Sequence, residues 1–123
     1  MEKGLVISVV DDDESVRESL PGLLKALGFL AHAFSSAEEY LASEGVGTSR
    51  CLILDVAMPG MSGPELQMEL KRRGLRTPII FITAHGDETI RRQLLERGAV
   101  ECLLKPFSDT QLLDALNVAL PQD

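Results

Sequence analysis

Residues 5–13 read Leu-Val-Ile-Ser-Val-Val-Asp-Asp-Asp, a mainly apolar run that stops in three consecutive acids. Residues 51–55, Cys-Leu-Ile-Leu-Asp, repeat this arrangement with a single aspartate at the end. Near-continuous apolar runs of this length are typical of strands that are covered on both faces, as in a parallel sheet. Both stretches therefore predict buried strands that are followed directly by acidic side chains.

The same pattern recurs along the chain and predicts five strands separated by amphipathic helices. The predicted strands are Leu5–Val10, Phe29–Phe34, Cys51–Leu54, Pro78–Ile82 and Val100–Leu104. This alternation predicts an α/β fold, a doubly wound parallel sheet with helices on both faces. The second segment is the least apolar and contains His32, which we expect to be solvated, so we place this strand at a sheet edge.

Serines followed three residues later by Glu or Gln predict the starts of three helices. The candidate pairs are Ser62 with Glu65, Ser108 with Gln111, and Ser35 or Ser36 with Glu38 or Glu39. Asp13 is expected to cap the first helix. Pro21 lies inside that helix and predicts a kink rather than a break, because the apolar spacing continues across it.

Length and composition limit the possible functions. The chain of 123 residues fits one domain, residues 1–123, and its 19 acids and 12 bases give a net charge of −7. This balance argues against direct nucleic-acid binding by the domain, which would need a basic surface. No apolar run approaches the roughly 20 residues of a membrane span. Cys51 and Cys102 lie in apolar segments, which indicates reduced thiols and a cytoplasmic location.

The charges are unevenly distributed along the chain. Residues 11–18 hold five acids and one base, whereas Lys and Arg crowd residues 71–97. We interpret the run at 71–76 as the basic end of a helix, because cations complement the carboxyl-terminal dipole.

Polar residues follow the predicted strands at the edge where parallel sheets place their functional crevice. These are Asp11, Asp12, Asp55, Thr83 and Lys105. Three neighbouring carboxylates repel one another, so the site must hold a proton or a cation. Oxygen donors without a cluster of His or Cys favour Mg²⁺. A hydroxyl and an ammonium beside them suit a phosphoryl group, and a carboxylate is a plausible nucleophile toward phosphorus.

Aspartate at a strand end more commonly caps a helix or forms a turn. That interpretation suits Asp13. It would also explain any one of Asp11, Asp12 and Asp55 if that residue occurred alone. It does not explain why three of them fall together with Lys105.

Four stretches, Val9–Asp13, Leu54–Gly63, Ile82–Asp87 and Lys105–Phe107, resemble the receiver domain of two-component response regulators. The resemblance is strongest to the FixJ-like (nitrogen-fixation-regulator-like) group, and it covers essentially the whole chain. It implies the (βα)5 flavodoxin-like receiver fold with strand order 2-1-3-4-5. It also implies a signalling switch that is activated by phosphorylation, and not a metabolic enzyme. Such a switch assists its own phosphotransfer and dephosphorylation.

The resemblance assigns roles to individual residues. Asp55 matches the phosphoacceptor, which receives a phosphoryl group from a sensor histidine kinase in a Mg²⁺-dependent reaction. Asp11 and Asp12 match the acidic pair that holds Mg²⁺, with Asp55 and the backbone carbonyl of Ala57 as further metal ligands.

Further roles follow from the same resemblance. Thr83 matches the switch hydroxyl and Lys105 the lysine that pairs with the phosphoryl group, while Pro106 fits a cis peptide bond. Cys102 departs from the family, which usually carries Tyr or Phe there, and we interpret it as a small half-buried residue. His85 is expected to be a loop residue rather than a metal ligand.

The resemblance also implies partners. Receivers commonly form phosphorylation-dependent homodimers through the fourth helix, fifth strand and fifth helix. Arg91 and Arg92 lie on the predicted fourth helix. They are candidates to pair with Asp109 or Asp114 of the last helix. The chain is either a single-domain regulator or the receiver of a longer protein. The FixJ-like pattern favours the second alternative and implies a C-terminal helix-turn-helix output domain, absent from this chain, that controls transcription.

Two other classes of protein share parts of this pattern. A haloacid-dehalogenase-type phosphatase needs a second Asp two residues after the nucleophile, where this chain has Ala57, and a cap domain for which 123 residues leave no room. A flavodoxin-type cofactor binder needs a Ser/Thr/Gly-rich phosphate loop after the first strand, where this chain has three acids. A receiver-like domain that binds partners but is never phosphorylated is a further alternative, and the presence of Asp55, Thr83 and Lys105 together argues against it.

Overall fold

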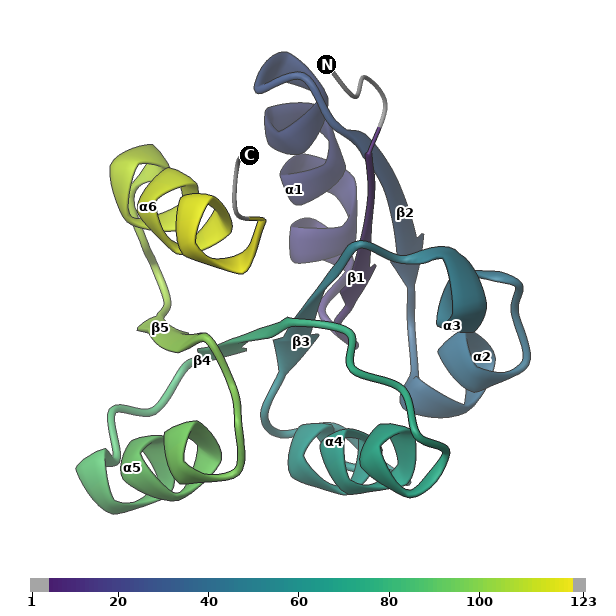
Figure 1. Cartoon of the computed structure of the whole chain (residues 1–123). Helices are drawn as coiled ribbons and strands as arrows, with labels where there is room; N and C mark the ends of the chain where they lie inside the picture. Colours follow the sequence, from purple (N-terminus) through teal and green to yellow (C-terminus); the bar gives the residue numbers. More distant parts are fainter. Residues whose placement is uncertain (1–4, 121–123) are drawn as a thin grey trace.

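The computed structural model describes residues 5–120 and contains a five-stranded parallel sheet in the order β2-β1-β3-β4-β5 (Figure 1). The strands are β1 (Val6–Val10), β2 (Leu30–Phe34), β3 (Cys51–Asp55), β4 (Ile79–Thr83) and β5 (Glu101–Leu104). The predicted fold class, strand order and edge position of β2 are confirmed. Each predicted strand is present, with its ends displaced by no more than one residue.

Six helices connect and flank the strands in the described residues. They are α1 (Glu14–Ala26), α2 (Ala37–Leu41), α3 (Gly45–Thr48), α4 (Gly63–Arg72), α5 (Glu88–Glu96) and α6 (Asp109–Ala119). The sequence pattern predicted a single helix between β2 and β3, and this was wrong. The Ser43 hydroxyl donates to the Tyr40 carbonyl at 2.6 Å and accepts the Gly45 N–H at 3.1 Å, which ends one helix and starts the next.

The predicted helix starts are confirmed. Capping boxes are formed at the starts of α4 and α6, and the Ser36 hydroxyl accepts the Glu39 N–H at the start of α2. Asp13 caps α1 by accepting the Ser15 N–H. Helix α1 continues through Pro21 without a break, as predicted, whereas the kink stays a prediction.

The helices cover both faces of the sheet (Figure 1). Helices α1 and α6 pack on one face, where Leu24 and Leu112 are buried against β1, β3 and β4. Helices α2, α4 and α5 lie on the other face, where Tyr40, Leu66 and Leu94 are buried. Because apolar side chains cover both faces, the functional groups gather at the ends of the strands.

The register of the strands brings their carboxyl ends together. Val10 of β1 pairs with Leu54 of β3, and Asp55 pairs with Ile82 of β4. The residues that follow β1, β3, β4 and β5 therefore meet at one edge of the sheet. Among residues 5–120, no helix has the length and apolar character needed to cross a membrane.

Candidate functional site

The end of β1 places Asp11 at the bottom of the site. Its side chain is fully buried, and its carboxylate oxygen Oδ1 accepts the Asp13 N–H at 2.9 Å. Its backbone is held on both sides, because its N–H donates to the Phe34 carbonyl at 3.1 Å and Nη1 of Arg17 donates to its carbonyl oxygen at 2.9 Å. The neighbouring Asp12 is exposed. Asp11 therefore has one orientation, whereas Asp12 faces solvent at the rim.

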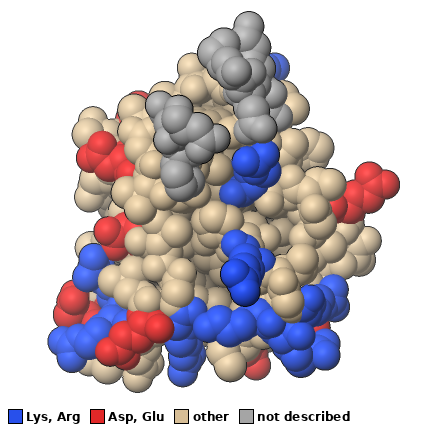
Figure 2. Space-filling model, viewed as in Figure 1, with Lys and Arg blue, Asp and Glu red and all other residues tan. Residues whose placement is uncertain are grey.

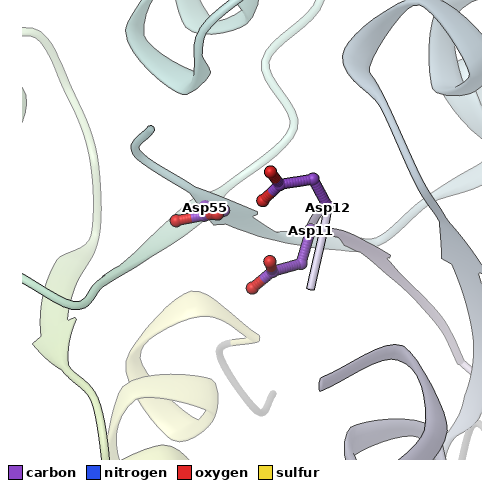
Figure 3. Close-up of side chains that lie close together, drawn as sticks. All are labelled: Asp11, Asp12 and Asp55. Carbon is purple, nitrogen blue, oxygen red and sulfur yellow. The ribbon is translucent and has the colours of Figure 1, made fainter. Parts of the chain in front are cut away.

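The end of β3 brings Asp55 to the same place. Figure 3 shows Asp11, Asp12 and Asp55 close together where β1 and β3 end, and one carboxylate oxygen from each lies within 4.8 Å of the other two. Only 6% of Asp55 is exposed. The three acids that the sequence predicted to converge are therefore brought together.

Lys105 enters the site from the end of β5. Its ammonium nitrogen lies 2.9 Å from Oδ2 of Asp11 and 3.8 Å from Oδ1 of Asp55. Its backbone N–H donates to the Thr83 carbonyl at 2.7 Å, and the Lys105–Pro106 peptide bond is cis, as the resemblance predicted. The lysine thus adds one positive charge to three carboxylates.

The pKa values of the site reflect this crowding. Burial, reinforced by the charge of Asp11, raises the pKa of Asp55 to about 7. For Lys105, burial acts to lower the pKa, but the hydrogen bond to Asp11 and the charge of Asp55 outweigh it and leave the pKa above its ordinary value. Negative charge in this pocket is therefore incompletely compensated by the protein itself.

The donor set fits a hard divalent cation. The cluster consists of carboxylates, which are the ligands that Mg²⁺ prefers, and their oxygens are close enough for one ion to contact all three. A bound cation would also offset the repulsion that raises the pKa of Asp55. The carboxylates of Asp11, Asp12 and Asp55 are therefore the residues that could hold a metal ion.

The loop after β3, residues 56–62, directly follows the phosphoacceptor candidate Asp55. Ala57 is exposed on this loop, and the Gly63 N–H closes the base of the loop by donating to the Val56 carbonyl at 3.0 Å. A Cβ atom on Gly63 would overlap the Asp55 carbonyl oxygen, so only glycine permits this close approach. The role of the Ala57 carbonyl as a metal ligand stays a prediction.

Thr83 lies at the end of β4, half-buried, but its hydroxyl is bonded to its own loop. It donates to the His85 carbonyl at 3.2 Å and accepts the His85 N–H at 3.1 Å. His85 itself is exposed. Thr83 therefore lies at the same sheet edge as the acidic cluster. Its hydroxyl, however, is hydrogen-bonded to the backbone of the β4–α5 loop.

A cavity of about 670 Å³ lies beside Thr83, between β5 and α5. Cys102 lines it and is half-buried, as predicted. Burial raises the pKa of this thiol, which suits a packing residue and not a reactive thiolate.

Arg91 also lines this cavity, and its ion pairs lie within the chain. Its guanidinium contacts Glu101 at 2.8 Å and Glu88 at 3.3 Å. These partners were not predicted from the sequence, which pointed to Asp109 or Asp114.

The basic run is separate from the acidic site. Figure 2 shows Lys and Arg side chains along the lower part of the face in view, over α4 and α5. Lys71 and Arg72 occupy the last turn of α4, and Glu69 pairs with both Arg72 and Arg73. The prediction of a basic helix end is confirmed.

Sequence reasoning missed Arg17. Its bond to the Asp11 carbonyl spans six residues and joins a helix to a strand end, so neither helical nor strand periodicity signals it. An isolated Arg within an acidic segment was the only available hint.

The fold and the acidic cluster define a response regulator receiver domain, and comparison with known proteins agrees. The family model described as "Response regulator receiver domain" matches residues 7–117, so the chain belongs to this family. It is 45% identical over 118 residues to Nodulation protein W of Bradyrhizobium diazoefficiens, covering 96% of this chain and 52% of that protein. It is 40% identical to the transcriptional regulatory protein FixJ of Azorhizobium caulinodans, covering 98% of this chain and 57% of that protein.

Solved structures give the same result. The response regulator StyR superposes with a TM-score of 0.87 at 44% identity, covering 97% of this chain and 60% of that one. The structure described as FixJ-N has a TM-score of 0.85 at 37% identity, covering 97% and 94%. The resemblance to the FixJ-like group is confirmed. The chain spans about half the length of the curated relatives it matches.

Proposed function

We propose that Asp55 accepts a phosphoryl group from a sensor histidine kinase in a Mg²⁺-dependent reaction. The observation that carries this proposal is the convergence of Asp11, Asp12 and Asp55 within 4.8 Å, with Lys105 ion-paired beside them. Relatives named as response regulators and transcriptional regulatory proteins support it.

In the proposed step, an ionised oxygen of Asp55 attacks phosphorus. The new O–P bond forms as the P–N bond to the phosphohistidine breaks, and the bonding pair leaves with the imidazole, which takes up a proton. Asp11, Asp12, Asp55 and the Ala57 carbonyl would hold Mg²⁺, which would supply charge neutralisation for the phosphoryl oxygens. Lys105, whose ammonium nitrogen lies 3.8 Å from Oδ1 of Asp55, would supply a second positive charge.

Thr83 would couple this step to the rest of the domain. Its hydroxyl now bonds to the His85 backbone, at 3.2 and 3.1 Å. A phosphoryl oxygen on Asp55 is a stronger acceptor and would draw the hydroxyl away, which would release those bonds and rearrange the β4–α5 loop. The domain therefore works as a switch.

Intact-mass spectrometry tests this function directly. With Mg²⁺ and acetyl phosphate or phosphoramidate, the wild type should gain one phosphoryl group, and Asp55→Ala should gain none. Chelation of Mg²⁺ should abolish the adduct in the wild type. An adduct that persists in Asp55→Ala, or its absence in the wild type, would overturn the proposal.

The proposed dimer contact is the face formed by α5, β5 and α6, which are the fourth helix, fifth strand and fifth helix of the receiver pattern. Ile90, Leu104 and Leu113 are large apolar residues from these three elements, and they are 40%, 51% and 37% exposed. Ile90 and Leu104 line the same cavity as Thr83 and the β4–α5 loop that Thr83 would rearrange. Light scattering should show a dimer after phosphorylation, and Leu104→Glu should keep the phosphorylated domain monomeric.

We further infer a cytoplasmic protein whose output domain regulates transcription. The length of the curated relatives and their names as transcriptional regulators support this, as do two free cysteines. Expression of the whole gene product and measurement of phosphorylation-dependent DNA binding would test it.

A further inference from the structure

The loop that follows Asp55 is held at its tip by a side chain from another part of the fold. Oε2 of Glu38, in the first turn of α2, accepts the Met61 N–H at 3.0 Å, across 23 residues of sequence. Gly60, the residue before Met61, has a φ of +72°. A Cβ atom on Gly60 would lie 2.7 Å from the same carboxylate oxygen. Glu38 therefore contacts the Gly60–Met61 peptide closely.

The base of the loop is already tied to the sheet. The Gly63 N–H donates to the Val56 carbonyl, and the Val56 N–H donates to the Ile82 carbonyl, both at 3.0 Å. Ala57 lies between this base and the tip held by Glu38. Ala57 is thus part of a loop that is held at both ends, and one of those ends depends on α2.

We propose that Glu38 is a positioning residue for the Mg²⁺ site: by accepting the Met61 N–H it holds the 56–62 loop so that the Ala57 carbonyl faces the carboxylate cluster. The inference rests on the proposed function of Asp55 and Ala57. Glu38 is not a member of the acidic cluster, and it acts through the backbone of the loop. Groups that orient ligands in this way contribute substantially to metal affinity.

Glu39 is a matched control on the same turn of α2. Its carboxylate accepts the Ser35 N–H at 2.6 Å and has no bond to the 56–62 loop in the described structure. Glu38→Ala and Glu39→Ala remove the same charge from the same helix. Glu38→Gln removes the charge but keeps an oxygen that can accept the Met61 N–H.

The first measurement uses metal-free protein. In Glu38→Ala the Met61 amide should exchange faster with solvent and change its NMR chemical shift, because its acceptor is lost. Glu38→Gln and Glu39→Ala should leave both properties of this amide close to wild type. An unchanged Met61 amide in Glu38→Ala contradicts the proposed contact.

The second measurement is the dissociation constant for Mg²⁺, followed by NMR titration, with the melting temperature of each variant recorded in parallel. Glu38→Ala should bind Mg²⁺ about tenfold more weakly than wild type. Glu38→Gln should restore most of the affinity, and Glu39→Ala should stay near wild type. Equal weakening by Glu38→Ala and Glu39→Ala would mean that charge, and not positioning, is responsible, and the inference would be wrong.

Gly60→Ala tests the same contact from the loop side without altering α2. At a φ of +72° an alanine strains the loop, and its Cβ would displace the Glu38 carboxylate, so Mg²⁺ should again bind more weakly. If both substitutions act through one contact, their combined effect should be smaller than the product of the two separate effects. Independent, multiplicative effects would count against the inference.

Phosphorylation separates this inference from the proposed function. If the wild type binds Mg²⁺ and gains a phosphoryl group while Glu38→Ala matches it at every Mg²⁺ concentration, only the role of Glu38 is overturned. If the wild type itself gains no phosphoryl group, the proposed function fails and this inference fails with it.

Discussion

The ammonium nitrogen of Lys105 lies 2.9 Å from Oδ2 of Asp11, which joins the ends of β5 and β1 across the two strands between them. Asp11 is fully buried, and the Lys105 side chain is 19% exposed. The pair therefore lies in an environment where the attraction between the two charges is weakly screened. Lys105 therefore supplies the positive charge that compensates the buried Asp11 carboxylate within the protein.

Lys105→Ala should destabilise the metal-free domain by about 2 kcal/mol, because it leaves the buried Asp11 carboxylate without its ion-pair partner. Saturating Mg²⁺ should restore most of this loss by binding the same carboxylates. Urea unfolding with and without Mg²⁺ measures both effects, and Lys25→Ala, on the exposed side of α1, is the control. A loss that is the same in both conditions would contradict the prediction.

The stability of the metal-free domain should depend on pH through Asp55. Its pKa is raised from 3.8 to about 7, so the native state binds this proton more tightly than the unfolded state. The stabilisation is therefore complete below about pH 4 and is lost as pH rises to about 7.

Asp55→Asn removes this titration. The wild type should lose on the order of 2 kcal/mol relative to Asp55→Asn between pH 4 and pH 7, allowing for solvent screening. Chemical unfolding across this range measures the difference. Parallel stability curves for the two proteins would show that Asp55 does not titrate in this window.

Two glycine substitutions should have opposite effects. In Gly63→Ala the new Cβ meets the Asp55 carbonyl oxygen, a backbone atom that cannot move aside, so we expect a loss of about 3 kcal/mol. In Gly22→Ala the new Cβ meets nothing within 4 Å, and the helix should gain about 0.5–1 kcal/mol. Thermal or urea unfolding of both variants checks the signs, and a neutral Gly63→Ala would be inconsistent with the close approach.

Cys102→Tyr should strengthen the coupling between phosphorylation and dimerisation. The residue lines the cavity of about 670 Å³ beside Thr83, where an aromatic ring could rotate with the switch hydroxyl, whereas a cysteine is too small to do so. Sedimentation of phosphorylated wild type and variant compares the two dimerisation constants. An unchanged or weaker response in the tyrosine variant would count against this explanation.

Ala57→Asn should shorten the lifetime of the phosphoryl group. Ala57 is exposed on the loop beside Asp55, and its methyl group cannot bind a water molecule, whereas an amide could hold one near phosphorus. The lifetime is measured by intact mass after removal of the phosphodonor. A phosphoryl group that survives longer in Ala57→Asn than in the wild type would refute the prediction.

Local pattern was sufficient for most of the fold. The apolar runs predicted all five strands, and the serine–acid and serine–amide pairs predicted the helix starts, because both signals depend on residues close in sequence. The split between α2 and α3 escaped this reasoning, since it depends on which hydrogen bonds Ser43 forms.

The sequence by itself determined which groups reach the functional edge, because polar residues that follow parallel strands must emerge at the same edge. Asp11, Asp12, Asp55 and Lys105 were identified in this way. Only the tertiary structure decided how these groups pair. Lys105 lies closer to Asp11 than to Asp55, and the Thr83 hydroxyl bonds to the His85 backbone.

The contacts made by Arg17 and Glu38 were also decided only by the tertiary structure. Each joins a helix to a loop or strand end from another part of the fold. Such contacts depend on how the helices and strands pack against one another. A change of about one ångström in the distance between two polar atoms separates a hydrogen-bonded ion pair from a longer, weaker contact. Sequence spacing defines the edge on which a side chain emerges, whereas packing sets the distances on which the chemistry depends.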